Sequence, residues 1–235
     1  MILWYGGKQS GSDSSKSDGV FLKTDASESL PLLVDKWREK IQLIYLDPPF
    51  FTGKKFSFRQ KIGKEGWQGS SKHIISHQAY ADVWDSRESF LDMLQEVLTL
   101  SHQLLKPEGS MFLHLDYRFS AHARLMMDKI FGESNFLNEI VWAYQTGGRT
   151  KRYFSRKHDT ILFYRKSDEH YFNADEVGKP RGTLKRNNMK KQIGEDGRVF
   201  WSIRSNGKEY RYYEDSKVYP SDVWDDISHT SLGYT

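Results

Sequence analysis

The chain has 235 residues, of which 28% are charged and 37% are hydrophobic, with no cysteine and a formal net charge of +4. This length allows one large or two small domains with a buried core, and the lack of cysteine excludes disulfides, thiolate nucleophiles and cysteine zinc sites. Because no run of about 18 apolar residues and no signal-peptide pattern occurs, we expect no membrane span and a cytoplasmic location.

The charge is distributed unevenly along the chain. Residues 145–213 carry 17 Lys and Arg against 8 Asp and Glu, and residues 51–78 carry 6 against 1. Because these stretches are locally +9 and +5 while the whole chain is +4, the remaining residues sum to −10. This separation indicates a polyanion-binding face on an acidic body. For residues 51–78 a solvated basic loop is an equally good interpretation.

The first ordered elements follow a stretch rich in Gly and Ser at residues 6–19, which matches neither phosphate-binding glycine motif and favours a flexible linker. Residues 20–24 predict a strand, and the apolar spacing over 26–38 predicts a helix. With a further strand at 41–46 they would form one βαβ unit. Asp25 lies between the first strand and the helix, where it could cap the helix N-terminus or contact a ligand.

Asp47-Pro48-Pro49-Phe50 directly follows the apolar segment 41–46. The segment predicts a strand buried on both faces of a parallel sheet. The prolines remove two N–H donors and stop the strand, so that the carbonyl groups of Asp47 and Pro48 have no ladder partners. Ligands of open α/β sheets bind outside the carboxyl ends of strands, so we expect a site here. Taken alone, the tetrapeptide is equally compatible with a structural turn.

The tetrapeptide suits chemistry on the exocyclic amino group of a base. Such a nitrogen is a poor nucleophile because its lone pair is delocalised into the ring. If the Asp47 carboxylate and the Pro48 carbonyl accept its two N–H bonds, they favour the pyramidal nitrogen that attacks an electrophilic methyl group. The Phe50 ring offers a surface on which an extruded base stacks, worth about 1–3 kcal/mol.

Residues 51–80 show no sustained period and are too numerous for a passive connection. They mix basic and aromatic side chains, which predicts a loop that closes over nucleic acid; disorder without function is the alternative. The proposed phosphate contacts are Lys54, Lys55 and Arg59. His73 and His77 are four residues apart but have no third ligand, so we expect no metal site.

The middle of the chain predicts two further crossover units. Asp85 and Glu88 form a capping-box pattern before a helix that ends near Pro107, a strand follows at 110–116, and a second helix ends at Gly132. The residues of this second helix expected to face inward are Leu125, Met126, Ile130 and Phe131.

Two more strands, at 139–144 and 160–166, are joined by a glycine-hinged basic loop. The loop residues proposed to contact phosphates are Arg149, Lys151 and Arg152. His114 and Asp116 stand at the carboxyl end of the strand before them. They either line the base pocket or form a satisfied polar pair.

Beyond Ser167 the sequence becomes β-rich, basic and aromatic. Residues 200–204 and 209–213 flank Asn206-Gly207, which predicts a hairpin. We therefore divide the chain into a core at 1–166 and a second region at 167–235. The second region either recognises a target or only packs on the core.

The Asp-Pro-Pro-Phe motif and several flanking stretches resemble the beta-group amino methyltransferases of restriction-modification systems. The stretches occur in that family's order and, together, cover most of residues 20–166. They are Tyr80-Ala81-Asp82-Val83-Trp84, 109–116, 138–142 and 157–164.

The resemblance implies an α/β fold with a Rossmann-like S-adenosylmethionine methyltransferase sheet in circularly permuted order, followed by a target-recognition region. It implies methyl transfer from S-adenosyl-L-methionine to an adenine N6 flipped out of duplex DNA, since the Asp form with Phe looks like the adenine branch rather than cytosine N4. Asp47, Pro48, Pro49 and Phe50 would be catalytic. Asp25 is similar in position to the acid that binds the cofactor's adenine.

The sequence departs from the family after the recognition region, where nothing matches the expected Asp-Pro-Phe strand and Gly-x-Gly turn. We therefore expect an incomplete sheet and weak or absent cofactor binding by this chain alone. Three explanations stay open: a truncated enzyme, a split enzyme completed by a second chain, or a non-catalytic DNA-binding subunit or remnant. A restriction subunit is a further expected partner, and a methyltransferase acting on RNA or protein glutamine is an alternative.

Overall fold

The computed structural model describes most of the chain outside the N-terminal linker and several loops. The described residues are 2–3, 20–22, 24–51, 53–61, 74–82, 84–144, 150–181 and 189–227. For the short or paired strands β1, β2, β4 and β5 the description covers the backbone only. The chain divides into one unit made of residues 1–170 and 223–235 and a second unit, Tyr171–Asp222.

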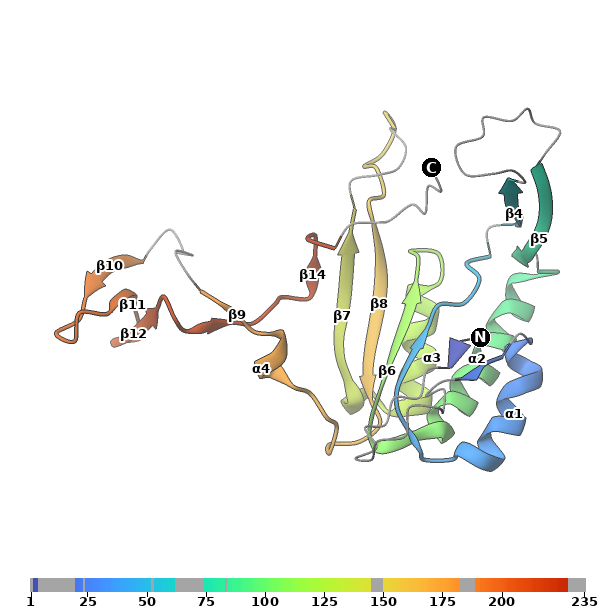
Figure 1. Ribbon diagram of the computed structural model, residues 1–235, viewed down its shortest axis with the longest axis horizontal. Coiled ribbons are helices and arrows are strands. Elements are labelled where there is room, and N and C mark those ends of the chain that lie inside the picture. The colour runs from blue at the N-terminus through green and yellow to red at the C-terminus, as the bar shows by residue number, and fades with distance from the viewer. Residues whose placement is uncertain are drawn as a thin grey trace. The chain divides into compact units, whose positions relative to one another are not determined.

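The first unit is built on a five-stranded mixed sheet with the order β14-β7-β8-β6-β3 (Figure 1). β3 pairs in parallel with β6, β8 runs antiparallel to both β6 and β7, and β14 pairs in parallel with β7. The strands are β3 (Ile41–Leu46), β6 (Leu105–Leu115), β7 (Phe136–Ala143), β8 (His158–Arg165) and β14 (Val223–Trp224). This is the α/β architecture predicted from the sequence.

Three helices pack on one face of this sheet: α1 (Ala26–Trp37), α2 (Arg87–Leu104) and α3 (Ser120–Phe131). Their apolar stripes meet alternate residues of the strands, because side chains of a strand point to opposite faces. The resulting core includes Phe90, Leu94 and Leu98 of α2 against Leu113 and Leu115 of β6, all fully buried. α1 joins through Leu30 and Val34, which pack near Ile44 and Leu46.

The helix ends agree with the sequence, with one shift. Asp25 caps α1 as predicted, and its carboxylate accepts a hydrogen bond from the Ser27 N–H. The capping box of α2 was placed one residue too early: Ser86 is the N-cap and Ser89 returns the bond. The capping pair is therefore Ser and Ser rather than Asp85 and Glu88, because either hydroxyl can both donate and accept.

On the other face of the sheet, the apolar cluster of described residues comes from strands alone, among them Ile140, Ile161 and Phe163. At the sheet edge this face is open: Leu43 is 55% exposed and Tyr45 is 52% exposed. The prediction that this strand is buried on both faces was therefore wrong. The apolar run is real, but β3 is an edge strand that the described helices cover on one side only.

Three other expectations are corrected. Val20–Phe21 (β2) pairs with Ile2–Leu3 (β1) in a separate two-stranded sheet and does not extend the main sheet into the predicted βαβ unit. The stretch after the motif contains two paired strands, β4 (Lys54–Lys61) and β5 (Ile74–Asp82). In α3, Phe131 is buried as predicted but Leu125 is 66% exposed, because Ala123 and Met127 occupy the inner face instead.

The second unit contains a three-stranded antiparallel sheet, β10-β11-β12, and a two-stranded one, β9 with β13. β11 and β12 form the predicted hairpin, and Asn206 and Gly207 both have positive φ in its turn, as a tight hairpin requires. The remaining bounds are α4 (Ala174–Val177), β9 (Lys179–Pro180), β10 (Lys190–Ile193), β11 (Val199–Ser205), β12 (Lys208–Tyr213), β13 (Lys217–Val218) and a short η2 turn at Glu133–Asn135 in the first unit.

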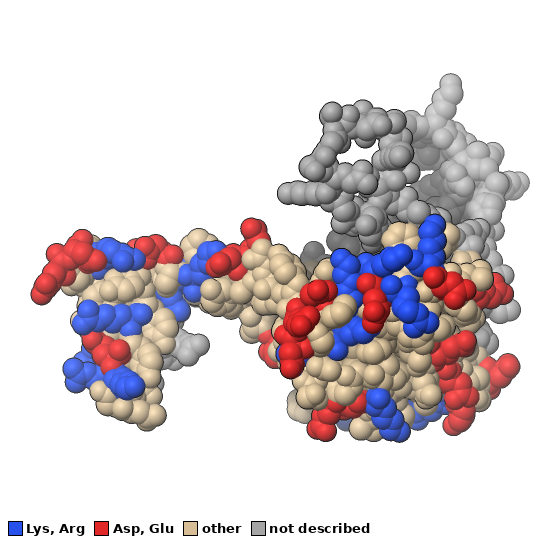
Figure 2. Space-filling view, turned by 90° about the horizontal axis from the view of Figure 1, so that it is seen from below, with Lys and Arg blue, Asp and Glu red and all other residues tan. Residues whose placement is uncertain are grey.

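Acidic and basic side chains are mixed on the end of the first unit where β6 and β7 begin, which is part of the face that Figure 2 presents. Here Lys166 pairs with Glu39 at 3.4 Å, and Arg165 pairs with Asp168. Such paired charges do not favour a polyanion, so this end of the sheet is not the expected nucleic-acid face. Among the helices that the structure describes, none has the length and apolar character of a membrane span.

Candidate active site

The Asp47 motif lies at the carboxyl end of β3, at the opposite end of the sheet. The Asp47 side chain is 55% exposed, Pro48 is buried, and Pro49 and Phe50 are half-buried. The structure thus brings together the four residues that the sequence singles out. One acid opens to solvent while the residues behind it are packed.

A strained residue fixes the chain directly behind the motif. Phe51 has φ +56°, in the left-handed region that non-glycine residues rarely adopt, and this turns the chain back over the core. Its ring packs against Phe90 and Phe119, with centroids 6.0 and 5.6 Å away. The conformation is therefore held by buried aromatic contacts, and Phe50 is presented from a rigid turn.

A second brace comes from the end of β6. The Arg118 guanidinium donates to the Phe51 carbonyl oxygen at 3.1 Å and, through Nε, to Asp116 at 2.7 Å. Asp116 also accepts the Arg118 backbone N–H. Asp116 is therefore a satisfied polar residue that supports the turn, which is one of the two roles open to it from the sequence.

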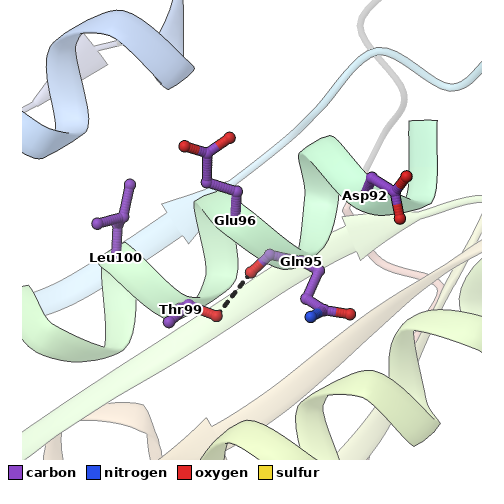
Figure 3. Close-up of a pocket in the computed structure, with 5 residues that line it drawn as sticks. All are labelled: Asp92, Gln95, Glu96, Thr99 and Leu100. Carbon is purple, nitrogen blue, oxygen red and sulfur yellow. Dashed lines mark hydrogen bonds between the residues drawn. The ribbon is translucent and has the colours of Figure 1, made fainter. Parts of the chain in front are cut away.

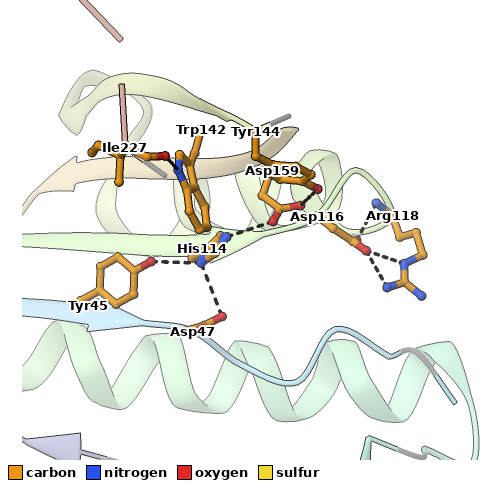
Figure 4. Close-up of polar contacts among 9 residues, drawn as sticks. All are labelled: Tyr45, Asp47, His114, Asp116, Arg118, Trp142, Tyr144, Asp159 and Ile227. Carbon is orange, nitrogen blue, oxygen red and sulfur yellow. Dashed lines mark hydrogen bonds and ion pairs between the residues drawn. The ribbon is translucent and has the colours of Figure 1, made fainter. Parts of the chain in front are cut away.

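His114 contacts Asp47 and two further polar side chains (Figure 4). Its Nδ1 lies 3.0 Å from the Tyr45 hydroxyl and 3.5 Å from an Asp47 oxygen, and its Nε2 lies 3.5 Å from Asp159. Sequence reasoning missed Tyr45 and Asp159. Strand alternation could have indicated Tyr45, which shares a face with Asp47, whereas Asp159, the second residue of β8, gave no local signal.

Burial and nearby acids raise several pKa values here. Burial, then Asp47 and Asp159, raise the pKa of Tyr45 to about 12. The pKa of Asp47 is raised, chiefly by burial and also by Asp159, against an opposing effect of His114. Burial, the charge of Asp159 and its hydrogen bond raise the pKa of Tyr144. At neutral pH both tyrosines are hydroxyl donors, while Asp47 is an acceptor that gains a proton more readily than a free aspartate.

Of the predicted phosphate contacts, two are described in full. Lys151 and Arg152 are exposed in the segment between β7 and β8. The same segment presents Phe154, which is 98% exposed, and Arg156, whose guanidinium lies 4.0 Å from the centroid of the Tyr117 ring. Arg149 and His73 lie outside the described residues, as do the side chains of His77, Lys54, Lys55 and Arg59.

A separate depression lies along the outer side of α2 (Figure 3). It is lined by Asp92, Gln95, Glu96, Thr99 and Leu100. Its lining holds two carboxylates but no aromatic ring and no basic group, so it does not fit a nucleotide. The Asp47 end of the sheet therefore remains the candidate site.

Several known proteins are similar to this chain in sequence. The chain is 26% identical over 167 residues to the EcoP15I Mod subunit of a type III restriction-modification enzyme from Escherichia coli, covering 67% of this chain and 26% of that protein. It is 30% identical over 129 residues to the type II methyltransferase M.KpnI from Klebsiella pneumoniae, covering 54% of this chain and 28% of that protein. It is 27% identical over 141 residues to the DNA adenine methyltransferase YhdJ from E. coli K12, covering 59% and 40%.

Solved structures give weaker likenesses. PvuII DNA methyltransferase, which is cytosine-N4-specific, matches with TM-score 0.41 at 14% identity, over 63% of this chain and 50% of that one. A complex of M1.HpyAVI with S-adenosyl-L-methionine matches with TM-score 0.37 at 15% identity, over 70% and 60%. The chain spans between 26% and 40% of the length of the three curated relatives above.

The family model described as DNA methylase, N6_N4_Mtase, matches residues 41–233, which include the Asp47 motif, His114 and Asp159. Enzymes of this family depend on S-adenosyl-L-methionine as methyl donor. Since the match covers most of the chain, the protein belongs to the N6/N4 DNA methylase family.

Proposed function

We propose that this chain supplies the base-binding part of a methyltransferase that transfers a methyl group to N6 of an adenine flipped out of duplex DNA. The observation that carries the proposal is the Asp47 tip: an open carboxylate and a proline carbonyl at a strand end, on a turn fixed by Phe51 and Arg118. Asp47 would accept one amino N–H and the Pro48 carbonyl the other. Phe50 would stack on the base.

The choice of adenine follows from the motif and from one relative. The motif has Asp in first place, as in the adenine branch that the sequence resembles, and YhdJ is named a DNA adenine methyltransferase. A neighbour in structure is named cytosine-N4-specific, so cytosine N4 is the competing product. Analysis of methylated nucleosides in treated DNA separates the two.

S-adenosyl-L-methionine supplies an electrophilic methyl group when it is bound. In this chain, Asp25 is the residue that would contact it. Because α1 runs antiparallel to β3 and the two have similar lengths, about 18 and 20 Å, Asp25 lies toward the same end of the sheet as Asp47 (Figure 1). Its Oδ1 accepts hydrogen bonds from Ser27 N and Oγ, whereas its Oδ2 makes none within the described residues. One carboxylate oxygen therefore suits a hydroxyl or amino group of the cofactor.

The rest of the cofactor site would come from additional polypeptide. The edge of β3 is an apolar margin of the sheet, because the side chains of Leu43 and Tyr45 are exposed there. The described residues show no glycine turn at a strand end beside this margin. We propose that the remaining part, on this polypeptide or on a second one, completes the sheet at this margin. A restriction subunit is a further proposed partner, since type III Mod subunits are among the relatives.

The proposed duplex contact is the segment between β7 and β8. Lys151 and Arg152 would contact phosphates, and the fully exposed Phe154 beside them suits an apolar contact with the bases. We also propose that phosphates are contacted by Arg149, Lys54, Lys55 and Arg59. Residues 167–235 would form the target-recognition region. A cytoplasmic location stays a prediction.

The same open sheet margin favours one second candidate, a DNA-binding subunit without catalysis. The decisive assay uses the chain purified from its own cells with the polypeptides that accompany it, isotope-labelled S-adenosyl-L-methionine and unmethylated genomic DNA. Labelled N6-methyladenine supports the proposal. Salt-sensitive duplex binding without any labelled base, in preparations that retain the accompanying polypeptides, would favour the second candidate.

A further inference from the structure

His114 is a buried titratable residue between two carboxylates. It is 5% exposed on β6, and the acids come from the strands on either side: Asp47 follows β3 and Asp159 lies on β8. The Asp47 side chain is 55% exposed and that of Asp159 is 15% exposed. One ring nitrogen therefore faces an acid that opens to solvent, and the other faces an inner acid.

We propose that His114 is a positioning residue for the methyl transfer, which accepts the proton that Asp47 takes from the methylated amino group, while Asp159 stabilises the resulting imidazolium. This inference rests on the proposed function and deepens it. The arrangement follows the logic of a base that is oriented by a third group. Distances of 3.5 Å are long for hydrogen bonds, as is common before a substrate tightens a site.

The relay requires one tautomer of His114. Nδ1 must be able to take a proton from Asp47, so the proposal places the N–H of neutral His114 on Nε2, directed at Asp159. The Tyr45 hydroxyl, which lies 3.0 Å from Nδ1 and keeps its proton at neutral pH, then donates to Nδ1. Nε2 is buried and makes no hydrogen bond of normal geometry in the described part of the chain. A buried polar atom without a partner is rare and calls for a functional reason.

The side chains around the His114 ring shield it from water. Asp47 and Asp159 remain in contact with the ring. Phe50 and Trp142 meet the ring edge-on, with centroids 5.4 and 5.5 Å away. The Tyr144 hydroxyl donates to Asp159 at 3.4 Å. The other charged pair nearby, Asp116 with Arg118, is already neutralised. Among the residues that the structure describes, the titratable groups that face His114 are Tyr45, Asp47 and Asp159, with Tyr144 behind them.

The transfer needs no reactant besides the base and S-adenosyl-L-methionine. The amino nitrogen would form a bond to the methyl carbon as the bond between that carbon and the sulfur of S-adenosyl-L-methionine breaks. The electron pair of the broken bond would stay on sulfur. The nitrogen then holds one proton too many. This proton passes to Asp47 and on to Nδ1 of His114 as the Tyr45 hydroxyl turns its own proton away and accepts from Nδ1 instead, and it returns to solvent through Asp47 when the product leaves.

The competing account is that water takes the proton from the exposed Asp47 and His114 only packs. Nitrogen-15 NMR of the eight histidines of the chain, with His114 assigned from His114→Gln, separates the two. We expect neutral His114 to be protonated at Nε2. We expect the ring-nitrogen resonances of His114 to shift in both Asp47→Asn and Asp159→Asn, since each variant replaces a carboxylate that faces one ring nitrogen. Asp92→Asn, an exposed acid on α2, is the matched control and should leave them unchanged.

Kinetics with the native assembly complete the test. Asp159→Asn should lower kcat about 100-fold, at the low end of the range for positioned acid–base groups, with little change in DNA affinity. His114→Gln should lower kcat to a similar extent, and combining it with Asp159→Asn should add little, because Asp159 acts through His114. His114 resonances that do not respond to Asp47→Asn or Asp159→Asn, or losses of kcat that add in the double variant, overturn the relay. Absence of methylation in the wild-type assembly overturns the proposed function and the relay with it, while the NMR result still reports the charge coupling.

Discussion

Arg118 donates a hydrogen bond to the Phe51 carbonyl oxygen at 3.1 Å while its Nε binds Asp116, so the turn that carries the Asp47 motif is fastened to the end of β6. Phe51 has a left-handed conformation that the surrounding structure must enforce. The brace and the strained residue act on the same peptide. Rigid presentation of Phe50 and Pro48 follows from both.

Replacing Arg118 should loosen this turn. Arg118→Met removes the bond to Phe51 and leaves the buried Asp116 without its partner, so we expect a loss of about 1–3 kcal/mol in the free energy of unfolding. Methylation should fall further than stability alone explains, because the acceptors lose their alignment. Urea denaturation and turnover measure the two effects. Arg38→Met, at the exposed end of α1, is the control, and an equal loss there would contradict the brace.

The ionised Asp47 should reduce stability. Its pKa is raised, chiefly by burial, so the folded state binds this proton more tightly than the unfolded state does. The resulting stabilisation is fully present below the unfolded pKa and is lost as pH rises through the folded pKa. Asp47→Asn should therefore be more stable than wild type at pH 7, and the difference should shrink as pH falls towards about 4. Urea midpoints at several pH values test this; a variant less stable at pH 7 contradicts it.

Phe50 should act through its flat ring. Phe50→Ala is expected to lose about 1–3 kcal/mol of base stacking, which corresponds to roughly 5- to 150-fold in kcat/KM on unmethylated DNA. Phe50→Tyr keeps the ring and should remain within a few fold of wild type. Because Phe50 also packs against the core, the unfolding free energy of both variants must be measured. Equal activity of the Ala and Tyr variants would remove the stacking role.

Lys151 and Arg152 should contribute through charge alone. Each phosphate contact that is lost should reduce the slope of log Kd against log salt by about 0.9. The double variant Lys151→Ala with Arg152→Ala should therefore lower the slope for random-sequence duplex by nearly two. Lys36→Ala with Lys40→Ala, on and just after α1, is a matched control of equal charge change. An unchanged slope in the first double variant would exclude phosphate contacts there.

The sequence predicted the local elements better than their environment. The hairpin at Asn206-Gly207, the Asp25 cap and the strand before Asp47 all follow from short-range chemistry of turns, caps and apolar runs. The exposure of Leu43 and Tyr45 could not be predicted from the sequence, because an apolar run has the same pattern whether its strand is central or at an edge. Whether β2 joins the main sheet is a long-range choice that no local signal records.

Some residues of the candidate site could likewise be predicted from the sequence, and others could not. Asp47 to Phe50 was visible as a motif, and His114 was visible as a polar residue at a strand end. Asp159 was not, since its proximity to His114 depends on the antiparallel register of β6 and β8, in which His114 lies opposite Ile161. Phe51 was hidden because its positive φ is imposed by tertiary packing.

The most direct test of the account is nucleoside mass spectrometry on unmethylated genomic DNA treated with the native assembly containing Asp47→Ala. If Asp47 accepts the target amino group, labelled N6-methyladenine should be abolished while duplex affinity stays within a few fold, and Asp92→Ala should methylate like wild type. Normal yields of N6-methyladenine from the Asp47→Ala assembly would contradict the central claim.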